Sequence, residues 1–188
     1  MCLFYTEKKV CKLKKMSEST TSLLRESFFH FDKKRWPIIV LTIRGKPVSD
    51  EDFDSFLETW KLIYVESMTK GERYKLIFDT RLAQMVKLDY LSKLGTWLKD
   101  IKDLTERWMD KTAIIVSNQS IQLLIQFVFR IYKAVRPFKI FNGKEDLSKA
   151  ILWLNTDDKG DLEIFDSKAA DIDEELKNNM IQNQFKLN

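Results

Sequence analysis

The sequence contains few of the residues on which several classes of protein depend. Among 188 residues, His30 is the single histidine, and Cys2 and Cys11 are the two cysteines. One imidazole excludes a multi-histidine metal site, and two cysteines exclude a cysteine-rich zinc module or a disulfide scaffold. The five glycines are isolated from one another, which excludes a phosphate-binding loop or a dinucleotide fingerprint. The sequence therefore predicts no metal site, no cofactor and no enzymatic activity.

Long apolar runs and a concentrated charge are also absent. No stretch approaches the roughly 18 apolar residues that a membrane-spanning helix needs. The net charge of +4 is spread over 32 basic and 28 acidic residues, so the chain has no basic stripe for nucleic acid. What the chain does contain is 44% hydrophobic residues, with 13 Phe and 5 Trp, which is the composition of a folded domain.

The two ends of the chain carry opposite charge. Residues 1–35 hold nine basic against four acidic residues, and residues 155–188 hold four against nine. We therefore expect a flexible basic segment at 1–27, a folded domain at 28–155 and an acidic tail at 156–188. Cys2 and Cys11 lie among lysines, so the first segment is either a solvated tail or, if acylated, a membrane-surface anchor. Reduced thiols predict a cytoplasmic protein, with a peripheral membrane association as the alternative.

Apolar runs and helical periodicities alternate along the middle of the chain. Phe29 and Phe31 alternate with polar residues and precede a β-branched run at 36–45, a pattern that predicts a hairpin. Further buried strands are expected at 74–79, 111–118 and 136–141, and helices at 49–70, 88–108, 121–135 and 144–154. This order predicts an α/β fold, with a mixed sheet of four to five strands covered by helices. The expected core includes Trp60, Leu98, Ile115, Phe141 and Trp153.

The segments of this domain have a familiar order and spacing. A strand ending at Gly45 is followed by YKLIFD, TAIIVSN and RPFKIFNGKEDLSKAILWL. Together they resemble the SpoIIAA-like branch of the STAS superfamily, over about residues 28–155. In that branch an aromatic extended stretch and an acidic turn lead into a helix that ends in Ala-x-x-Trp-Leu; the matching residues here are Phe138, Phe141, Glu145, Ala150, Trp153 and Leu154.

The resemblance implies a small, non-enzymatic α/β module. Proteins of this kind bind protein partners, nucleotides or lipids, and the SpoIIAA-like branch has been likened to the CRAL-TRIO fold of lipid carriers. Classical members carry a phosphorylated serine after the YKLIFD-type strand. Residues 86–88 of this chain are Val, Lys and Leu, so that switch is not carried over.

Four polar residues follow the predicted strands. Asp79 and Arg81 come at the end of the second strand of the sheet interior, and Asn118 and Ser120 follow the next one. Open α/β sheets bind ligands at the carboxyl ends of their strands, so these residues are candidates to contact a ligand. The alternative is structural, since strand-end Asp residues bind backbone N–H groups and Asn or Ser can cap the next helix.

The predicted helix 121–135 is more apolar than its position requires. Eleven of its fifteen residues are apolar, whereas a helix that covers a sheet needs an apolar face of somewhat over 100°. Either neighbouring elements cover the excess or it forms a contact surface. For the second case we expect an interface that includes Phe127, Phe129, Arg130 and Tyr132.

Two functions remain open at this point. The first is a non-catalytic module that binds a protein partner or a second copy of itself through helix 121–135. The alternative is a lipid-binding or membrane-associated protein of the carrier type. A lipid carrier should have an apolar cavity between its sheet and its helices, whereas a protein-binding module should have a filled core and an exposed apolar patch.

Overall fold

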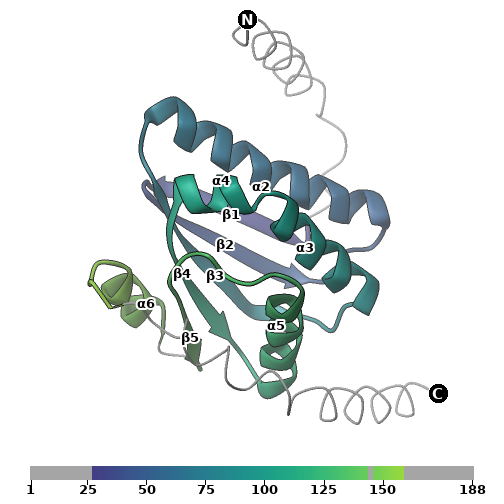
Figure 1. The fold of residues 1–188 in the computed structure, drawn as a ribbon. Coiled ribbons are helices and arrows are strands. Elements are labelled where there is room, and N and C mark those ends of the chain that lie inside the picture. Colours follow the sequence, from purple (N-terminus) through teal and green to yellow (C-terminus); the bar gives the residue numbers. More distant parts are fainter. Residues whose placement is uncertain (1–26, 144–145, 159–188) are drawn as a thin grey trace, which may run out of the picture.

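A five-stranded sheet runs through the middle of the protein (Figure 1). The structure is a computed structural model, and it describes residues 27–143 and 146–158. The basic segment expected at 1–27 and the acidic tail expected at 156–188 lie almost entirely outside these residues. The strands are β1 (Phe29–Arg35), β2 (Ile38–Gly45), β3 (Tyr74–Ala83), β4 (Met109–Val116) and β5 (Phe138–Asn142).

The strands lie side by side in the order in which they occur in the chain. β1 pairs with β2 in the antiparallel direction, as the predicted hairpin requires, with Phe31 opposite Leu41. β2, β3, β4 and β5 are parallel, and Thr42 of β2 lies opposite Asp79 of β3, which in turn lies opposite Ile115 of β4. The strands in the interior of the sheet are apolar on both faces, which is why they read as continuous hydrophobic runs in the sequence.

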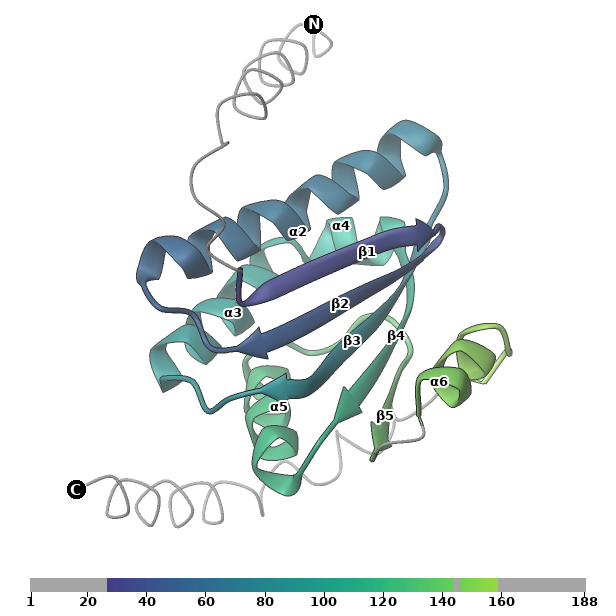
Figure 2. The same cartoon turned by 180° about the vertical axis from the view of Figure 1, so that it is seen from behind.

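The helices form two unequal layers on the sheet. Because neighbouring parallel strands are also consecutive in sequence, right-handed crossovers place each connecting helix on the same face. Figure 1 shows α2, α3, α4 and α5 on that face, and Figure 2 shows the opposite face, where α6 lies beside β4 and β5. The helices are α2 (Asp50–Lys70), α3 (Leu88–Asp100), α4 (Lys102–Trp108), α5 (Gln119–Ile131) and α6 (Asp146–Leu154).

Local sequence signals explain where two of these helices begin and where one ends. The side chain of Ser49 accepts a hydrogen bond from the backbone N–H of Asp52 at the start of α2, and Gly71 ends that helix in the left-handed conformation, with φ of 65°. Asn118 caps α5 in the same way as Ser49 caps α2, since its side chain accepts from the N–H of Ile121.

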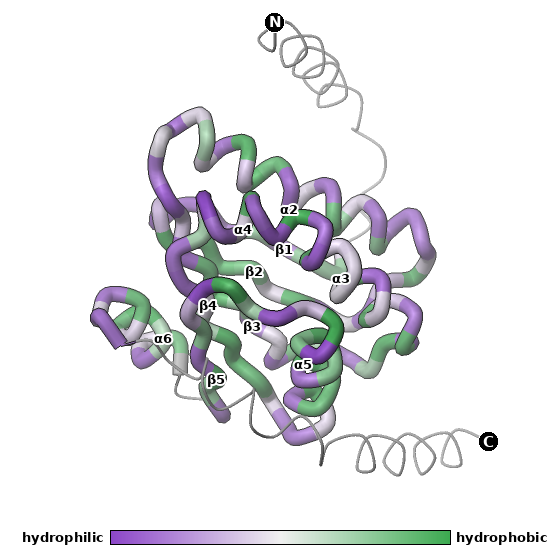
Figure 3. Tube along the Cα trace, viewed as in Figure 1, coloured by the Kyte–Doolittle hydropathy of each residue, from purple (hydrophilic) through white to green (hydrophobic). Residues whose placement is uncertain are grey.

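Each face of the sheet has its own hydrophobic core. The larger core lies between the sheet and α2 to α5, and the smaller one lies between the sheet and α6, around Ile77, Ile115 and Trp153. Figure 3 shows hydrophobic residues along the central strands and on α5, whereas α2 alternates between hydrophobic and hydrophilic residues. Of the residues expected in the core, Trp60, Leu98, Ile115 and Trp153 are buried, and Phe141 is half-buried.

The smaller core contains a buried lysine. Lys111 of β4 is 7% exposed, and its ammonium group donates hydrogen bonds to the carbonyls of Thr156 and Asp158, just beyond α6. The same Nζ lies 4.9 Å from the centre of the Trp153 ring. Lys111 therefore supplies hydrogen-bond donors to carbonyl groups that follow α6, the helix that covers this face of the sheet.

The α/β fold and the mixed sheet predicted from the sequence are confirmed, with two corrections to the helices. The single helix expected over 88–108 is two helices, because the chain turns at Ile101, which has φ of −99° and ψ of 17°. The helix expected over 121–135 ends at Ile131, and Tyr132 has extended backbone. Beyond that point Tyr132 and Ala134 still face the larger core, so the apolar pattern in the sequence continues although the helix has ended.

Candidate functional site

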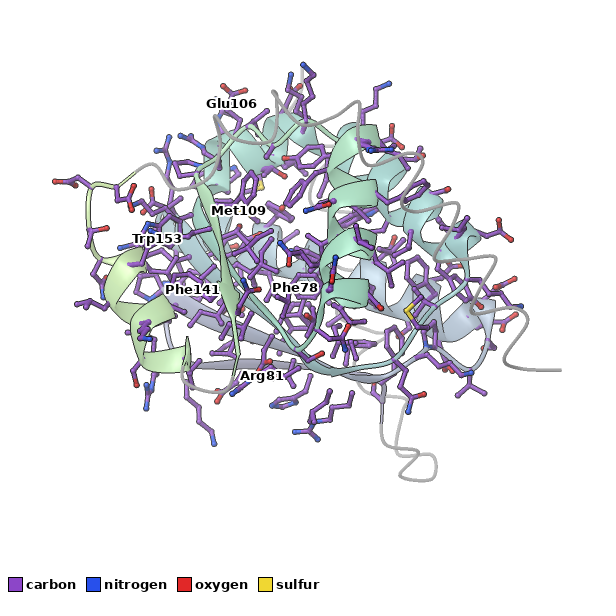
Figure 4. All side chains as sticks on the ribbon, turned by 90° about the horizontal axis from the view of Figure 1, so that it is seen from below. Phe78, Arg81, Glu106, Met109, Phe141 and Trp153 are labelled. Carbon is purple, nitrogen blue, oxygen red and sulfur yellow. The ribbon has the colours of Figure 1, made fainter. Side chains whose placement is uncertain are left out.

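The helix-facing side of the sheet forms an apolar floor. Successive side chains of a strand point to opposite faces, so Leu76, Phe78 and Thr80 of β3 share one face with Thr112 and Ile114 of β4. Figure 4 shows Phe78 and Met109 on the side of the sheet where α5 lies, and Phe141 and Trp153 on the side of α6. The floor is therefore built from the central strands, where backbone groups are paired on both sides.

Helices α3 and α5 lie over this floor. α3 contributes Leu91, Leu94 and Leu98, which are spaced by three and four residues and so share one face of the helix. α5 contributes Ile121, Leu124, Ile125 and Val128 at similar spacing.

The two helices approach each other closely at Gly95. An ideal Cβ built on Gly95 would lie 2.7 Å from the Cβ of Ile131 on α5. Since real Cβ atoms almost never come within 3.0 Å of another heavy atom, only a glycine permits this crossing. Gly95 therefore sets the spacing of the two helices over the sheet.

A cavity of about 150 Å³ lies between this floor and the helices. Phe78 and Thr112 lie on strands in the interior of the sheet, yet both are only half-buried, and both line the cavity. Gln84, just after β3, is the exposed member of the lining, and Phe28, Ala83 and Val86 near it are half-buried. An engineered cavity of about the same volume, lined by Leu, Ile and Phe, stays dry and binds benzene.

Aromatic rings close the side of the cavity next to α2. Phe56 lies between rings of β1 and α2, with its centroid 5.2 Å from that of Phe29 and 5.6 Å from that of Trp60. Trp60 also lies 5.5 Å from Trp97 of α3. These tilted and edge-to-face pairs are the arrangements that aromatic rings prefer, and they join β1, α2 and α3 in one wall.

Hydroxyl groups gather where α2, α4 and the end of α5 meet. The hydroxyls of Tyr64 and Thr105 are 2.9 Å apart, and the indole of Trp60 donates to the hydroxyl of Tyr74 over 3.3 Å. Tyr132, which is 5% exposed, lies in the same region and lines the cavity with Thr105. Buried polar groups are thus paired with one another at this end of the cavity.

Burial controls the acidity of these tyrosines. Desolvation raises the pKa of Tyr64 to about 12, and hydrogen bonding with Thr105 acts weakly in the other direction. Desolvation also raises the pKa of Tyr132 and, well above its usual value, that of Tyr74. A phenolate is poorly solvated in this environment, so all three side chains stay neutral at physiological pH.

Among the described residues, Arg136 is the cation that lines the cavity, four residues after Tyr132. Arg136 sits between α5 and β5, and its Nη2 donates to the backbone carbonyl of Glu106 at α4. Its Nε is buried and has no hydrogen-bond partner. No carboxylate in residues 27–143 and 146–158 forms an ion pair with Arg136. Arg136 is not among the site residues predicted from the sequence, although an arginine between Val135 and Pro137 stands out in this apolar segment.

The residues expected at an interface on helix 121–135 are placed in different surroundings. Tyr132 is buried in the larger core, and the ring of Phe129 stacks on Phe138 of β5 with centroids 4.4 Å apart. Phe127 is half-buried against the same core, and Arg130 is also half-buried. Phe129 and Tyr132 therefore contribute to the lining of the cavity.

The polar residues expected at the strand ends make hydrogen bonds within the protein or lie at the surface. Asp79 is 6% exposed, and its carboxylate accepts hydrogen bonds from the backbone N–H, the Nε and the Nη2 of Arg81 over 3.1, 2.9 and 2.7 Å. Both side chains belong to the face of the sheet opposite the cavity. Asn118 caps α5 and donates to the hydroxyl of Ser117, while Ser120 is exposed in the first turn of that helix.

Two further classes of site have no counterpart in the described part of the chain. Within residues 27–143 and 146–158, no three His, Cys, Asp or Glu side chains are grouped as a metal ion would require. None of the helices in these ranges combines the length and apolar character needed to cross a membrane.

Comparison of the chain with protein-family models, with curated proteins and with solved structures gives no match. The resemblance to the SpoIIAA-like branch therefore rests on the sequence segments alone. The class of protein that the fold and the site define is an α/β protein with an apolar cavity between its sheet and one helix layer.

Proposed function

We propose that this protein is a non-enzymatic binding module that holds a small apolar molecule, or the apolar part of a larger one, in the cavity between the sheet and α3 and α5. The observation that carries the proposal is the cavity itself, about 150 Å³ in volume and lined almost entirely by aliphatic and aromatic side chains. Such a lining offers a ligand burial of its apolar surface, with few polar groups to be desolvated.

The side chains around an apolar space of this size lack part of the packing that a filled interior would give them. Protein interiors normally close such spaces by side-chain packing. A cavity that stays open between well-formed helices is therefore better explained by a ligand that fills it.

The chemistry of the lining favours binding over catalysis. In the part of the chain that the structure describes, the lining includes no Ser, Cys, His, Lys, Asp or Glu, the side chains that most often act as nucleophile, general acid or general base. Its three threonine hydroxyls are also used within the protein, since Thr80 donates to the carbonyl of Ile115, Thr105 pairs with Tyr64 and Thr112 donates to the sulfur of Met109. This agrees with the non-enzymatic modules that the SpoIIAA-like resemblance implies.

The same observations favour one of the two functions expected from the sequence. A protein-binding surface on α5 needs Phe129 and Tyr132 to be free, whereas Tyr132 is buried and Phe129 stacks on Phe138. The excess apolar surface of α5 instead faces the cavity, α3 and β5. This supports ligand binding, the function that the sequence left as the alternative.

Thermal unfolding in the presence of 1-octanol tests the proposal. A ligand that binds only the folded state stabilises it by about 2.7 kcal/mol at a concentration 100 times its Kd, so the Tm of the full chain should rise by several degrees. Thr112→Phe places a ring in the cavity and should remove this rise. Thr96→Phe, an exposed position on α3, is the matched control and should keep it.

Two outcomes would overturn the proposal. One is a Tm that 1-octanol leaves unchanged at any concentration in the wild-type chain. The other is an equal rise in Thr112→Phe and in the wild-type chain, which would place the alcohol elsewhere. If Thr112→Phe does not fold, as judged by circular dichroism, Thr112→Leu provides a smaller reduction of the cavity and should lower the response in part.

A further inference from the structure

Among the described residues that line the cavity, Arg136 is the one that carries a charge. Arginine keeps its charge at any pH that the folded protein experiences. A guanidinium in apolar surroundings is poorly stabilised unless each N–H has an acceptor and a counter-charge lies close by. Within residues 27–143 and 146–158, the Nε of Arg136 has no acceptor and no carboxylate forms an ion pair with the guanidinium.

Two hydroxyl side chains that are already hydrogen-bonded within the protein line the cavity together with Arg136. Tyr132 and Thr105 also line the cavity, and the pKa of Tyr132 is raised by burial, which keeps its hydroxyl protonated. The three side chains come from three elements, the end of α5, α4 and the segment before β5. They give this end of the cavity a polar, positively charged character, whereas Leu94, Leu98 and Ile114 make the rest apolar.

We propose that the ligand is a single-chain carboxylic acid of the fatty-acid type, with its carboxylate beside Arg136 and its alkyl chain in the cavity. This inference rests on the proposed function and specifies its ligand. A carboxylate matches the planar fork of a guanidinium and forms charge-assisted hydrogen bonds with it, so it would supply the acceptor and the counter-charge that Arg136 lacks.

The size of the cavity restricts the chain. A volume of about 150 Å³ corresponds to a space that holds benzene in an engineered protein, so it fits one alkyl chain of modest length and excludes a lipid with two acyl chains. A single guanidinium also suits one carboxylate, since phosphate groups are usually held by several donors and cations.

Octanoate and 1-octanol separate this inference from the proposed function, because the two probes share an alkyl chain and differ in charge. Calorimetric titration at neutral pH should show octanoate binding about tenfold or more tightly than 1-octanol to the wild-type chain, as expected for a charge-assisted hydrogen bond. Arg136→Met keeps an unbranched apolar stem but removes the cation, and should bring the two probes to equal affinity. Arg107→Met, an exposed position on α4, is the matched control and should preserve the preference.

Each result has a distinct meaning. Equal binding of both probes by the wild-type chain overturns the carboxylate inference and leaves the proposed function intact. A preference for octanoate that persists in Arg136→Met likewise overturns the role of Arg136. Failure of both probes to bind the wild-type chain overturns the proposed function and this inference together. The wild-type comparison does not depend on any variant, and Arg136→Lys, which keeps the charge but loses the fork, should show an intermediate preference.

Discussion

The close approach of α3 and α5 predicts that Gly95→Ala lowers the stability of the protein. Replacing this glycine by alanine places a Cβ 2.7 Å from the Cβ of Ile131, 2.9 Å from its Cγ2 and 3.1 Å from its Cδ1. The Cβ of Ile131 is fixed to the backbone of α5 and cannot rotate away. The helices must therefore move apart, which disturbs their packing over the cavity.

Two opposing effects determine the size of the change. Overpacking of this kind costs about 1–3 kcal/mol, whereas replacing Gly by Ala within a helix gains about 0.5–1 kcal/mol. The clash involves three atoms of Ile131, so we expect the first effect to dominate, with a net loss of about 1–2 kcal/mol.

Urea unfolding of the full chain, followed by circular dichroism, measures this loss. Thr96→Ala, at the next and exposed position of α3, is the control and should change stability by less than about 0.5 kcal/mol. Ile131→Ala removes Cγ2 and Cδ1, so Gly95→Ala should cost less in that background. A Gly95→Ala protein as stable as the wild type would show that the two helices are not held together at this point.

Three further predictions concern stability. The unfolded chain ionises its tyrosines near pH 10, whereas Tyr64 in the folded state keeps its proton up to about pH 12. Unfolding therefore releases a proton in this interval, and the free energy of unfolding should fall by about 1.4 kcal/mol per pH unit because of this group. Tyr64→Phe should reduce this slope, and an unchanged slope would contradict the burial of the phenol. Lys111→Met should lower stability by about 1–3 kcal/mol, because two carbonyls lose their donor, while the exposed Lys99→Met should have little effect. Leu98→Ala should cost about 2–5 kcal/mol in the same denaturation assay, and a change below about half a kcal/mol would mean that the inward face of α3 is misassigned.

Much of the fold could be predicted because burial on both faces produces an unmistakable sequence pattern. The strands of the sheet interior are β-branched runs such as Ile38–Val40 and Ile114–Val116, and these were found within a few residues of their ends. The divided helix α3–α4 could not be predicted, since neither Gly nor Pro marks the turn at Ile101. The end of α5 was missed because Tyr132 continues the apolar pattern in an extended segment, and periodicity cannot separate the two over so few residues.

The candidate site was only partly visible in the sequence. The excess of apolar residues on α5 correctly indicated that this helix needs more than a sheet to cover it. In the structure, α5 is covered by α3, which contacts it at Gly95, and by Phe138 of β5, which stacks on Phe129. The position of Arg136 depends on α4, about 30 residues earlier in the chain. Contacts of this range leave no periodic signal, so the cavity appears only when the elements are assembled.

Nuclear Overhauser effects between 1-octanol and the methyl groups of the protein are the sharpest test of a ligand in the cavity, because they report where the alkyl chain lies. We expect contacts with the methyls of Leu76, Ile114 and Val128, which line the cavity, and none with those of Leu62 and Leu152, which are exposed. Contacts restricted to the exposed methyls, or no contacts at saturating alcohol, would contradict the assignment of the cavity as a ligand site.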